Sequence, residues 1–304
     1  MDQQAFTNTI LNQFKVHQDA TAPTPLSPQE DLVPNSNPVS EVNPVVRSKY
    51  QSLIGSLMYL MLGTRLDLAY AVGKLAHFSA NPSQSHFIAA NRVLQYVNST
   101  QHLYLEMDPG SDQIHINAFT DADFAQSKPD RKSTSRYYFY INGTVFSWSS
   151  KKQSTVATST MEAEYIGLFH ASQQAAWVVQ FMAQIRLPLD YPISIYCDSE
   201  AAIATAEAEN PHKLSKHLNV KLHSIRERIA QCTIRVQSML TAENTTNLLT
   251  KSLPIVTFQK HYSCLGLEPL DYNKEEEAEV DAMLTPPQDD EDIPESETRG
   301  SVEQ

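Results

Sequence analysis

The dipeptide Asn142-Gly143 lies between two short runs rich in aromatic and β-branched residues, 137–141 and 145–148. Both residues tolerate the positive φ angles that a two-residue turn between antiparallel strands requires, so this segment is predicted to be a β-hairpin. The hairpin places an antiparallel pair of strands near the middle of the chain.

Alternating segments on both sides of the hairpin extend this picture. A half-buried strand is expected at 114–120, where Ile114, Ile116 and Ala118 share one face. The expected elements after the hairpin are a helix at 160–185, a strand at 193–197, at least two helices and a strand near 233–236. This order predicts an α/β fold with a mixed sheet covered by helices.

The first third of the chain is predicted to be helical. Residues 1–16 have the spacing of a short amphipathic helix, and 48–78 and 83–98 also read as helices. Between them, 17–47 is a linker rich in proline and small polar residues. Residues 1–110 are therefore expected to form a small helical subdomain, and 111–270 a second domain.

The negative charge of the chain is concentrated at its end. Of the formal net charge of −12, residues 271–304 contribute 13 acidic and 2 basic side chains, and the rest of the chain is nearly neutral. Such a segment has too little apolar surface to fold, so a disordered acidic tail is expected.

The most apolar segment, Leu53–Gly63, is 11 residues long, well short of the roughly 18 residues that indicate a membrane span. No signal-peptide pattern opens the chain, and the three cysteines match neither a disulfide framework nor a paired-cysteine zinc site. An intracellular protein, cytoplasmic or nuclear, with no membrane contact is expected.

Two carboxylates follow two of the predicted strands. Asp121 lies just after strand 114–120, and Asp198 just after strand 193–197, each on the face opposite to the aliphatic residues of its strand. If the two strands are parallel neighbours, Asp121 and Asp198 meet at the carboxyl edge of the sheet. A single acid at a strand end is more often a solvated turn residue.

The helix at 160–185 supplies a third acid. Ser159 and Glu162 match a capping box, which gives Glu162 a structural role. Glu164 instead falls in phase with the apolar face of the helix, which includes Leu168 and Ala171. Three carboxylates in a partly dry site require a cation, and oxygen ligands favour Mg²⁺. Two such ions, about 3.5–4 Å apart, can stabilise the attacking and leaving oxygens of a phosphodiester displacement, and Mn²⁺ is expected to substitute.

Several motifs together resemble one family. In order along the chain they are Thr120-Asp-Ala-Asp-Phe-Ala, Asp130-Arg-Lys-Ser-Thr-Ser, Phe146-Ser-Trp-Ser-Ser-Lys-Lys-Gln, Met161-Glu-Ala-Glu-Tyr, Tyr196-Cys-Asp-Ser-Glu-Ala-Ala, Lys216-His217 and Leu249-Thr-Lys-Ser-Leu-Pro. This order resembles the ribonuclease H domain of copia-type retrotransposon polyproteins. Upstream, Tyr50-Gln-Ser-Leu-Ile-Gly and Thr64-Arg-Leu-Asp resemble the segment that follows the polymerase palm in the same polyproteins.

The resemblance implies a ribonuclease H-like fold with a mixed five-stranded sheet, and cleavage of the RNA strand of RNA/DNA hybrids with two Mg²⁺ ions held by four carboxylates. Asp121, Glu164 and Asp198 match three of them, whereas the fourth position is Asn247. An amide brings no charge, so the second ion should bind more weakly. Asn219 also stands where the family commonly has Asp.

Two other acids are weaker candidates for the missing ligand. Glu243 fits better as a first-turn acid of a helix, and Asp123 fits better in a loop. A Tyr-x-Asp-Asp polymerase motif is absent from the sequence, so no polymerase activity is expected.

Residues 213–229 are predicted to form an amphipathic helix whose basic side chains could follow a phosphate backbone, although a solvated helix face would look similar. The candidate nucleic-acid contacts are Lys213, Lys216, His217, Lys221 and Arg228, with Lys151 and Lys152 beside Trp148, itself expected in the core.

The leading prediction is therefore a ribonuclease H that acts on RNA/DNA hybrids within a retrotransposon polyprotein, whose other parts are further expected partners. The alternative is a catalytically inactive nucleic-acid-binding or relic domain. The oligomeric state does not follow from these patterns.

Overall fold

The computed structural model describes residues 1–27, 32–106, 114–125, 127, 130–208, 216–240, 249 and 253–269. The chain divides into two units, Met1–Pro269 and Leu270–Gln304, and all described residues belong to the first. The acidic tail predicted at 271–304 lies outside the described residues.

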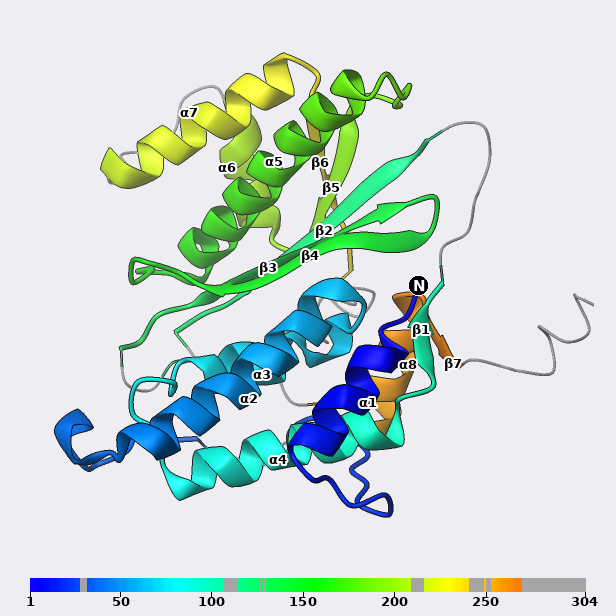
Figure 1. The fold of residues 1–304 in the computed structure, drawn as a ribbon. Coiled ribbons are helices and arrows are strands. Elements are labelled where there is room, and N and C mark those ends of the chain that lie inside the picture. Colours follow the sequence, from blue (N-terminus) through cyan, green and yellow to red (C-terminus); the bar gives the residue numbers. More distant parts are fainter. Residues whose placement is uncertain are drawn as a thin grey trace, which may run out of the picture. The chain divides into compact units, whose positions relative to one another are not determined.

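A mixed five-stranded sheet in the order β4-β3-β2-β5-β6 forms the centre of the first unit (Figure 1). Its strands are β2 (Ile116–Asp123), β3 (Thr134–Ile141), β4 (Thr144–Lys152), β5 (Ile193–Cys197) and β6 (Ile234–Ser238). β2, β3 and β4 pair antiparallel, whereas β2, β5 and β6 pair parallel. The predicted α/β fold with a mixed sheet is confirmed. So is the hairpin, where Asn142 and Gly143 have φ angles of 48° and 93°.

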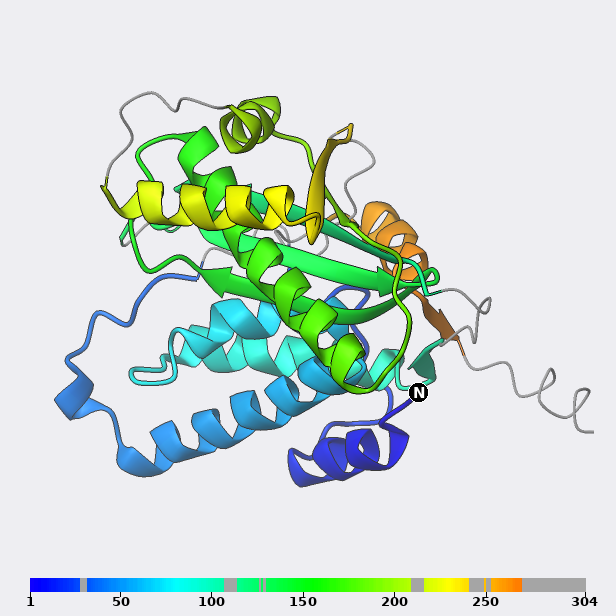
Figure 2. The same ribbon diagram turned by 90° about the horizontal axis from the view of Figure 1, so that it is seen from above.

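Helices cover both faces of this sheet (Figures 1 and 2). The helices are α1 (Gln4–Gln13), α2 (Pro44–Gly63), α3 (Ala69–Ala76), α4 (Gln84–Ser99), α5 (Thr160–Gln184), α6 (Glu200–Glu207), α7 (Lys216–Ala230) and α8 (Ile255–Cys264). Ile116, Ala118 and Phe139 pack with α5, α6 and α7 in one core. Tyr138 and Val145 join the core of the N-terminal helices and α8. Among the described residues, no helix is both long and apolar enough to cross a bilayer.

The helix expected at 48–78 is broken. α2 ends at Gly63, a 3₁₀ turn follows at Leu66–Leu68, and α3 begins at Ala69. At the break, Arg65 and Asp67 form an ion pair of 2.8 Å with side chains 3% and 0% exposed, and the Tyr96 hydroxyl donates to Asp67. A buried charge pair needs the local geometry that satisfies it, and a continuous helix does not provide this.

Two other boundaries differ from the prediction. The linker at 17–47 ends earlier, because Asn43 caps α2 through the Val45 amide and Pro44 occupies the first turn. A small antiparallel sheet of β1 (Leu103–Leu105) and β7 (Leu267–Pro269) was not predicted. Strands this short carry almost no periodic signal.

Gly167 allows α5 to lie unusually close to β2. A Cβ atom at this position would meet Asp121 O and Thr120 Oγ1, each at 3.3 Å. Because Gly167 lies about one turn after Glu164, this close approach also fixes how far Glu164 reaches over the sheet.

Gly167→Val is therefore expected to lower the free energy of unfolding by about 1–3 kcal/mol, because its methyl groups would overpack the α5–β2 contact. Gly55→Val is the matched control, because a Cβ at the exposed helical Gly55 meets nothing within 4 Å. Urea unfolding of both variants checks this, and an equally small effect in both would contradict the close-packing account.

Candidate active site

Asp121 and Asp198 lie side by side where a parallel ladder ends. The last pair of the β2–β5 ladder is Phe119 with Tyr196, whose rings stack at 4.9 Å. Asp121 and Asp198 each follow two residues later, so they share the face of these two rings. The expectation that the strands are parallel neighbours is confirmed, whereas β2 continues beyond 120 and contains both Asp121 and Asp123.

Glu164 reaches the same place from α5. Its side chain is on the buried face of the helix with Leu168 and Ala171, as its phase predicted, and is only 6% exposed. The amide of Ala122, just beyond the end of the β2–β5 ladder, donates to the Glu164 carboxylate. Its other oxygen, Oε2, is buried and has no hydrogen-bond partner in the part of the chain that the structure describes.

The neighbouring Glu162 has the structural role expected of it. Ser159 accepts from the Glu162 amide at 3.1 Å. The Glu162 carboxylate accepts from the amide and hydroxyl of Thr158, at 2.8 and 2.5 Å. Of the two glutamates near the start of α5, Glu162 therefore caps the helix and Glu164 belongs to the site.

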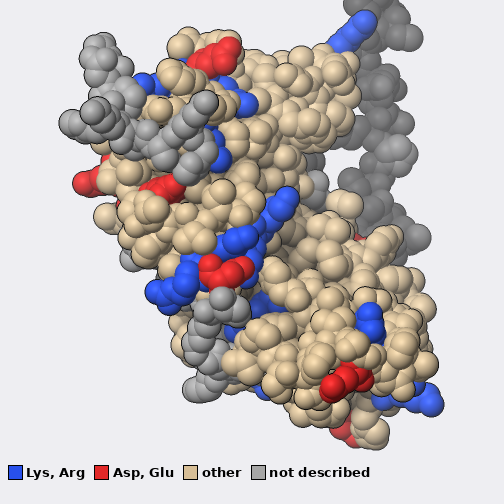
Figure 3. All heavy atoms as spheres, turned by 90° about the vertical axis from the view of Figure 1, so that its left-hand side faces the viewer, with Lys and Arg blue, Asp and Glu red and all other residues tan. Residues whose placement is uncertain are grey.

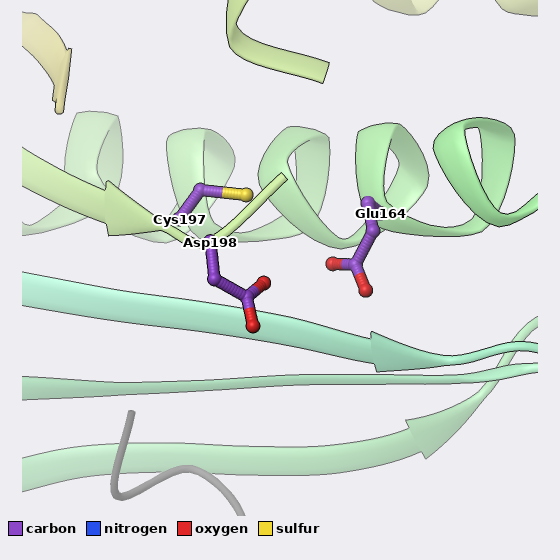
Figure 4. A group of neighbouring side chains, drawn as sticks. All are labelled: Glu164, Cys197 and Asp198. Carbon is purple, nitrogen blue, oxygen red and sulfur yellow. The ribbon is translucent and has the colours of Figure 1, made fainter. Parts of the chain in front are cut away.

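Burial and nearby negative charge raise the pKa of Glu164 to about 9, with Asp121 and Asp198 the contributing charges. Burial also raises the pKa of the Cys197 thiol to about 12, with Glu164 the largest contributing charge. Ligand atoms of Glu164, Cys197 and Asp198 all lie within 4.8 Å of one another. Figure 4 shows that the carboxyl groups of Glu164 and Asp198 point toward the strands, whereas the Cys197 thiol lies nearer the helix.

Arg136 is a site residue that the sequence reasoning missed. It lies opposite Asp121 in the β2–β3 ladder and is 1% exposed. Its guanidinium donates to Asp121 at 3.2 Å and to Asp123 at 3.0 Å. Asp123 also accepts from the Thr134 amide and is the last residue of β2, so the expected loop position for Asp123 is wrong. The available signal was an arginine within a strand, directly before the aromatic run that begins at Tyr137.

The fourth position, Asn247, lies outside the described residues, as do Glu243 and Lys213. The structure thus brings together Asp121, Glu164 and Asp198, and adds Arg136 to them. Lys216 and His217 begin α7, but their side chains are outside the described part.

The predicted basic contacts divide between the two faces of the sheet. Lys151 is exposed, and both Lys151 and Lys221 lie near enough to His170 to lower its pKa, after burial. Lys221 also lies over the Phe169 ring at 5.7 Å. Lys152 is on the opposite face, where it pairs with Asp130 at 2.9 Å. In Figure 3, basic side chains gather near the middle of the visible face.

Arg228 and Trp148 are largely structural. Arg228 donates to Ser224 and Ser172, which ties α7 to α5. Trp148 is partly buried against the N-terminal core and donates to Met61 O at 3.1 Å, as expected for a core residue.

A cavity of about 500 Å³ adjoins the site between α3 and the ends of β2, β3 and β4. Asp123, Lys152, Tyr70, Lys74 and His77 are among its lining residues. No sequence pattern predicted it, because its walls come from segments far apart in the chain.

The raised pKa of Glu164 predicts a pH-dependent stability in metal-free buffer. Between its ordinary value of 4.5 and about 9, the folded state holds a proton that the unfolded state loses, so this contribution to stability falls as pH rises. Glu164→Gln should remove that slope and raise the free energy of unfolding at pH 8 by about 2 kcal/mol.

Urea titrations between pH 5 and 9 test this expectation. Glu162→Gln is the control. Its free energy of unfolding should be about 1 kcal/mol lower than that of the parent, because the hydrogen bonds from Thr158 are weakened, and its pH dependence should match that of the parent. Identical slopes for Glu164→Gln and the parent would contradict the assignment.

The chain is similar in sequence to retrotransposon Pol polyproteins. The Retrovirus-related Pol polyprotein from transposon TNT 1-94 of Nicotiana tabacum is 34% identical over 269 residues, which are 88% of this chain and 20% of that protein. The corresponding polyprotein from transposon RE1 of Arabidopsis thaliana is 34% identical over 222 residues, 72% of this chain and 15% of that protein. The chain thus spans about a fifth or less of these relatives.

A shorter relative, secreted RxLR effector protein 161 of Plasmopara viticola, is 46% identical over 129 residues, 42% of this chain and 90% of that protein. No family model matches the chain.

Among solved structures, LC11-RNase H1, isolated from compost, has a TM-score of 0.35 at 16% identity, covering 44% of this chain and 91% of that one. The foamy viral protease-reverse transcriptase in complex with RNA/DNA hybrid has a TM-score of 0.40 at 11% identity, and the match covers 83% of this chain and 28% of that one. The chain belongs to the copia-type retrotransposon Pol polyproteins.

Proposed function

We propose that this domain hydrolyses the RNA strand of RNA/DNA hybrids with the help of divalent cations. The observation that carries the proposal is that the carboxylates of Glu164 and Asp198 lie within 4.8 Å of each other, with Asp121 close enough to help raise the pKa of Glu164. The Oε2 of Glu164, which is buried and has no hydrogen-bond partner among the described residues, supports it, because an orphaned carboxylate oxygen in a dry site is costly unless a cation binds it.

The donor set fits Mg²⁺, with Mn²⁺ as a substitute, because carboxylate oxygens are the ligands both ions prefer. When bound, such ions activate water and stabilise the charge on the leaving oxygen. Asp121 and Asp198 would hold the ions from the strand ends. Glu164, fixed by the Ala122 amide, would hold them from the helix.

The exposed Lys151 and the nearby Lys221 would position the phosphate backbone of the hybrid on the α5 side of the site. Other parts of a retrotransposon polyprotein are the proposed protein partners, and the cytoplasm or nucleus is the proposed location. No polymerase activity is proposed.

A catalytically silent nucleic-acid-binding domain is the second candidate. It is favoured by the Arg136 ion pair, which already neutralises part of the charge on Asp121, and by Asn247 at the fourth ligand position.

Cleavage of a labelled RNA/DNA hybrid in Mg²⁺ and in Mn²⁺ separates the two candidates. Asp121→Asn should reduce the rate by on the order of a hundredfold or more, because a charged ligand of the proposed catalytic ions is lost. Asn247→Asp should raise the rate by restoring the fourth charge. If neither the parent nor Asn247→Asp cuts the hybrid, the silent domain is the correct description.

Lys221→Ala is expected to weaken hybrid binding several-fold and to reduce the slope of log affinity against log salt by about 1, because one phosphate contact is lost. Lys49→Ala, an exposed lysine on α2, is the matched control and should leave the slope unchanged. Fluorescence anisotropy at several salt concentrations measures both. If Lys221→Ala and the parent have the same slope of log affinity against log salt, Lys221 does not contact the hybrid.

A further inference from the structure

Arg136 is a buried cation placed directly against a proposed metal ligand. Its side chain is 1% exposed, and Nη1 donates to Asp121 Oδ2 at 3.2 Å. Because Arg136 and Asp121 are directly opposite in an antiparallel ladder, this contact is set by the register of β2 and β3. It is therefore a fixed feature of the fold and not a chance surface ion pair.

Asp123 holds the guanidinium in this position. The second contact, from Nη2 to Asp123 Oδ2, measures 3.0 Å, and the Asp123 side chain is 7% exposed. Asp123 also accepts from the Thr134 amide, which fixes the carboxylate. If Arg136 swung away, a buried acid would lose its counter-ion, which is strongly unfavourable. Asp123 thus holds Arg136 beside Asp121.

The charge of Arg136 acts on the whole site. Besides pairing with Asp121, it is close enough to Glu164 to oppose part of the rise in the pKa of Glu164. A cation bound among Asp121, Glu164 and Asp198 would share a carboxylate with the guanidinium and be repelled by it, in surroundings where water screens charge poorly.

We propose that Arg136 is an internal counter-ion that competes with divalent cations for Asp121, so that the site is held together without metal and binds metal weakly. The inference rests on the proposed function only in assigning a divalent ion to Asp121. It identifies a determinant of metal affinity that is independent of the fourth ligand position.

Manganese binding to the purified protein, followed by the electron paramagnetic resonance of free Mn²⁺ in the absence of nucleic acid, tests this proposal. Arg136→Gln should bind Mn²⁺ at least roughly tenfold more tightly than the parent, because the competing charge is gone. Arg136→Lys retains the charge and should stay within about threefold of the parent.

Arg65→Gln is the matched control. Arg65 is also a buried arginine paired with an aspartate, but Asp67 is its partner and lies on the N-terminal helices. Its substitution should affect stability without changing Mn²⁺ affinity. If Arg136→Gln does not fold, the double variant Arg136→Gln/Asp123→Asn, which removes both buried charges, should show the same tightening.

Unchanged or weaker Mn²⁺ binding in a folded variant without the Arg136 charge would overturn the proposal, as would equal tightening in Arg65→Gln. Cleavage assays give a separate result. Tight Mn²⁺ binding without hybrid cleavage would support the counter-ion role and count against the ribonuclease function. Cleavage by the parent with no tightening in Arg136→Gln would count only against the counter-ion role.

Discussion

Mutual repulsion among clustered carboxylates, of which Glu164 is buried, is the constraint on which the rest of this site depends. Asp121 and Asp198 are brought together because each lies two residues beyond the last pair of the parallel β2–β5 ladder, and Glu164 lies close to them because Gly167 lets α5 approach β2. The fold gains nothing from placing like charges together. The arrangement is stable only if protons or cations reduce the repulsion. The raised pKa of Glu164 favours a proton on that group, and the Arg136 ion pair places a positive charge beside Asp121.

The negative charge of the site is reduced in two ways, by a proton on Glu164 and by the Arg136 guanidinium, and the two differ in how they respond to a metal ion. A proton on Glu164 can leave when a metal ion binds. Arg136 cannot move away in the same manner, because Asp123 would then be a buried negative charge without a counter-ion. The domain therefore keeps its shape without metal, but the same device opposes metal binding. With a site that binds metal weakly, the domain would have an activity between that of an efficient nuclease and that of a catalytically silent relic.

Much of this geometry could be predicted from the sequence, because it follows from periodicity. Alternation along two strands placed Asp121 and Asp198 on one face, and helical phase separated Glu164 from Glu162. The Asn142-Gly143 turn fixed the hairpin because so few residues accept its backbone angles. These signals are local, and the topology needed only the rule that parallel strands share a carboxyl edge.

The rest depends on contacts between distant segments. The partnership of Arg136 with Asp121 requires the β2–β3 register, and the loop between these strands is too long for turn chemistry to set it. Likewise, the break between α2 and α3 depends on the buried Arg65–Asp67 pair and on Tyr96, 29 residues beyond Asp67. A single sequence carries no record of such pairings.

Anomalous diffraction from crystals soaked in Mn²⁺ would test the central claim most directly, because manganese is visible at its own absorption edge. The account predicts a peak bounded by Asp121, Glu164 and Asp198, with the Arg136 guanidinium displaced or the peak shifted away from it. A well-ordered site with no peak at saturating Mn²⁺, or a peak that none of these three carboxylates touches, would contradict it.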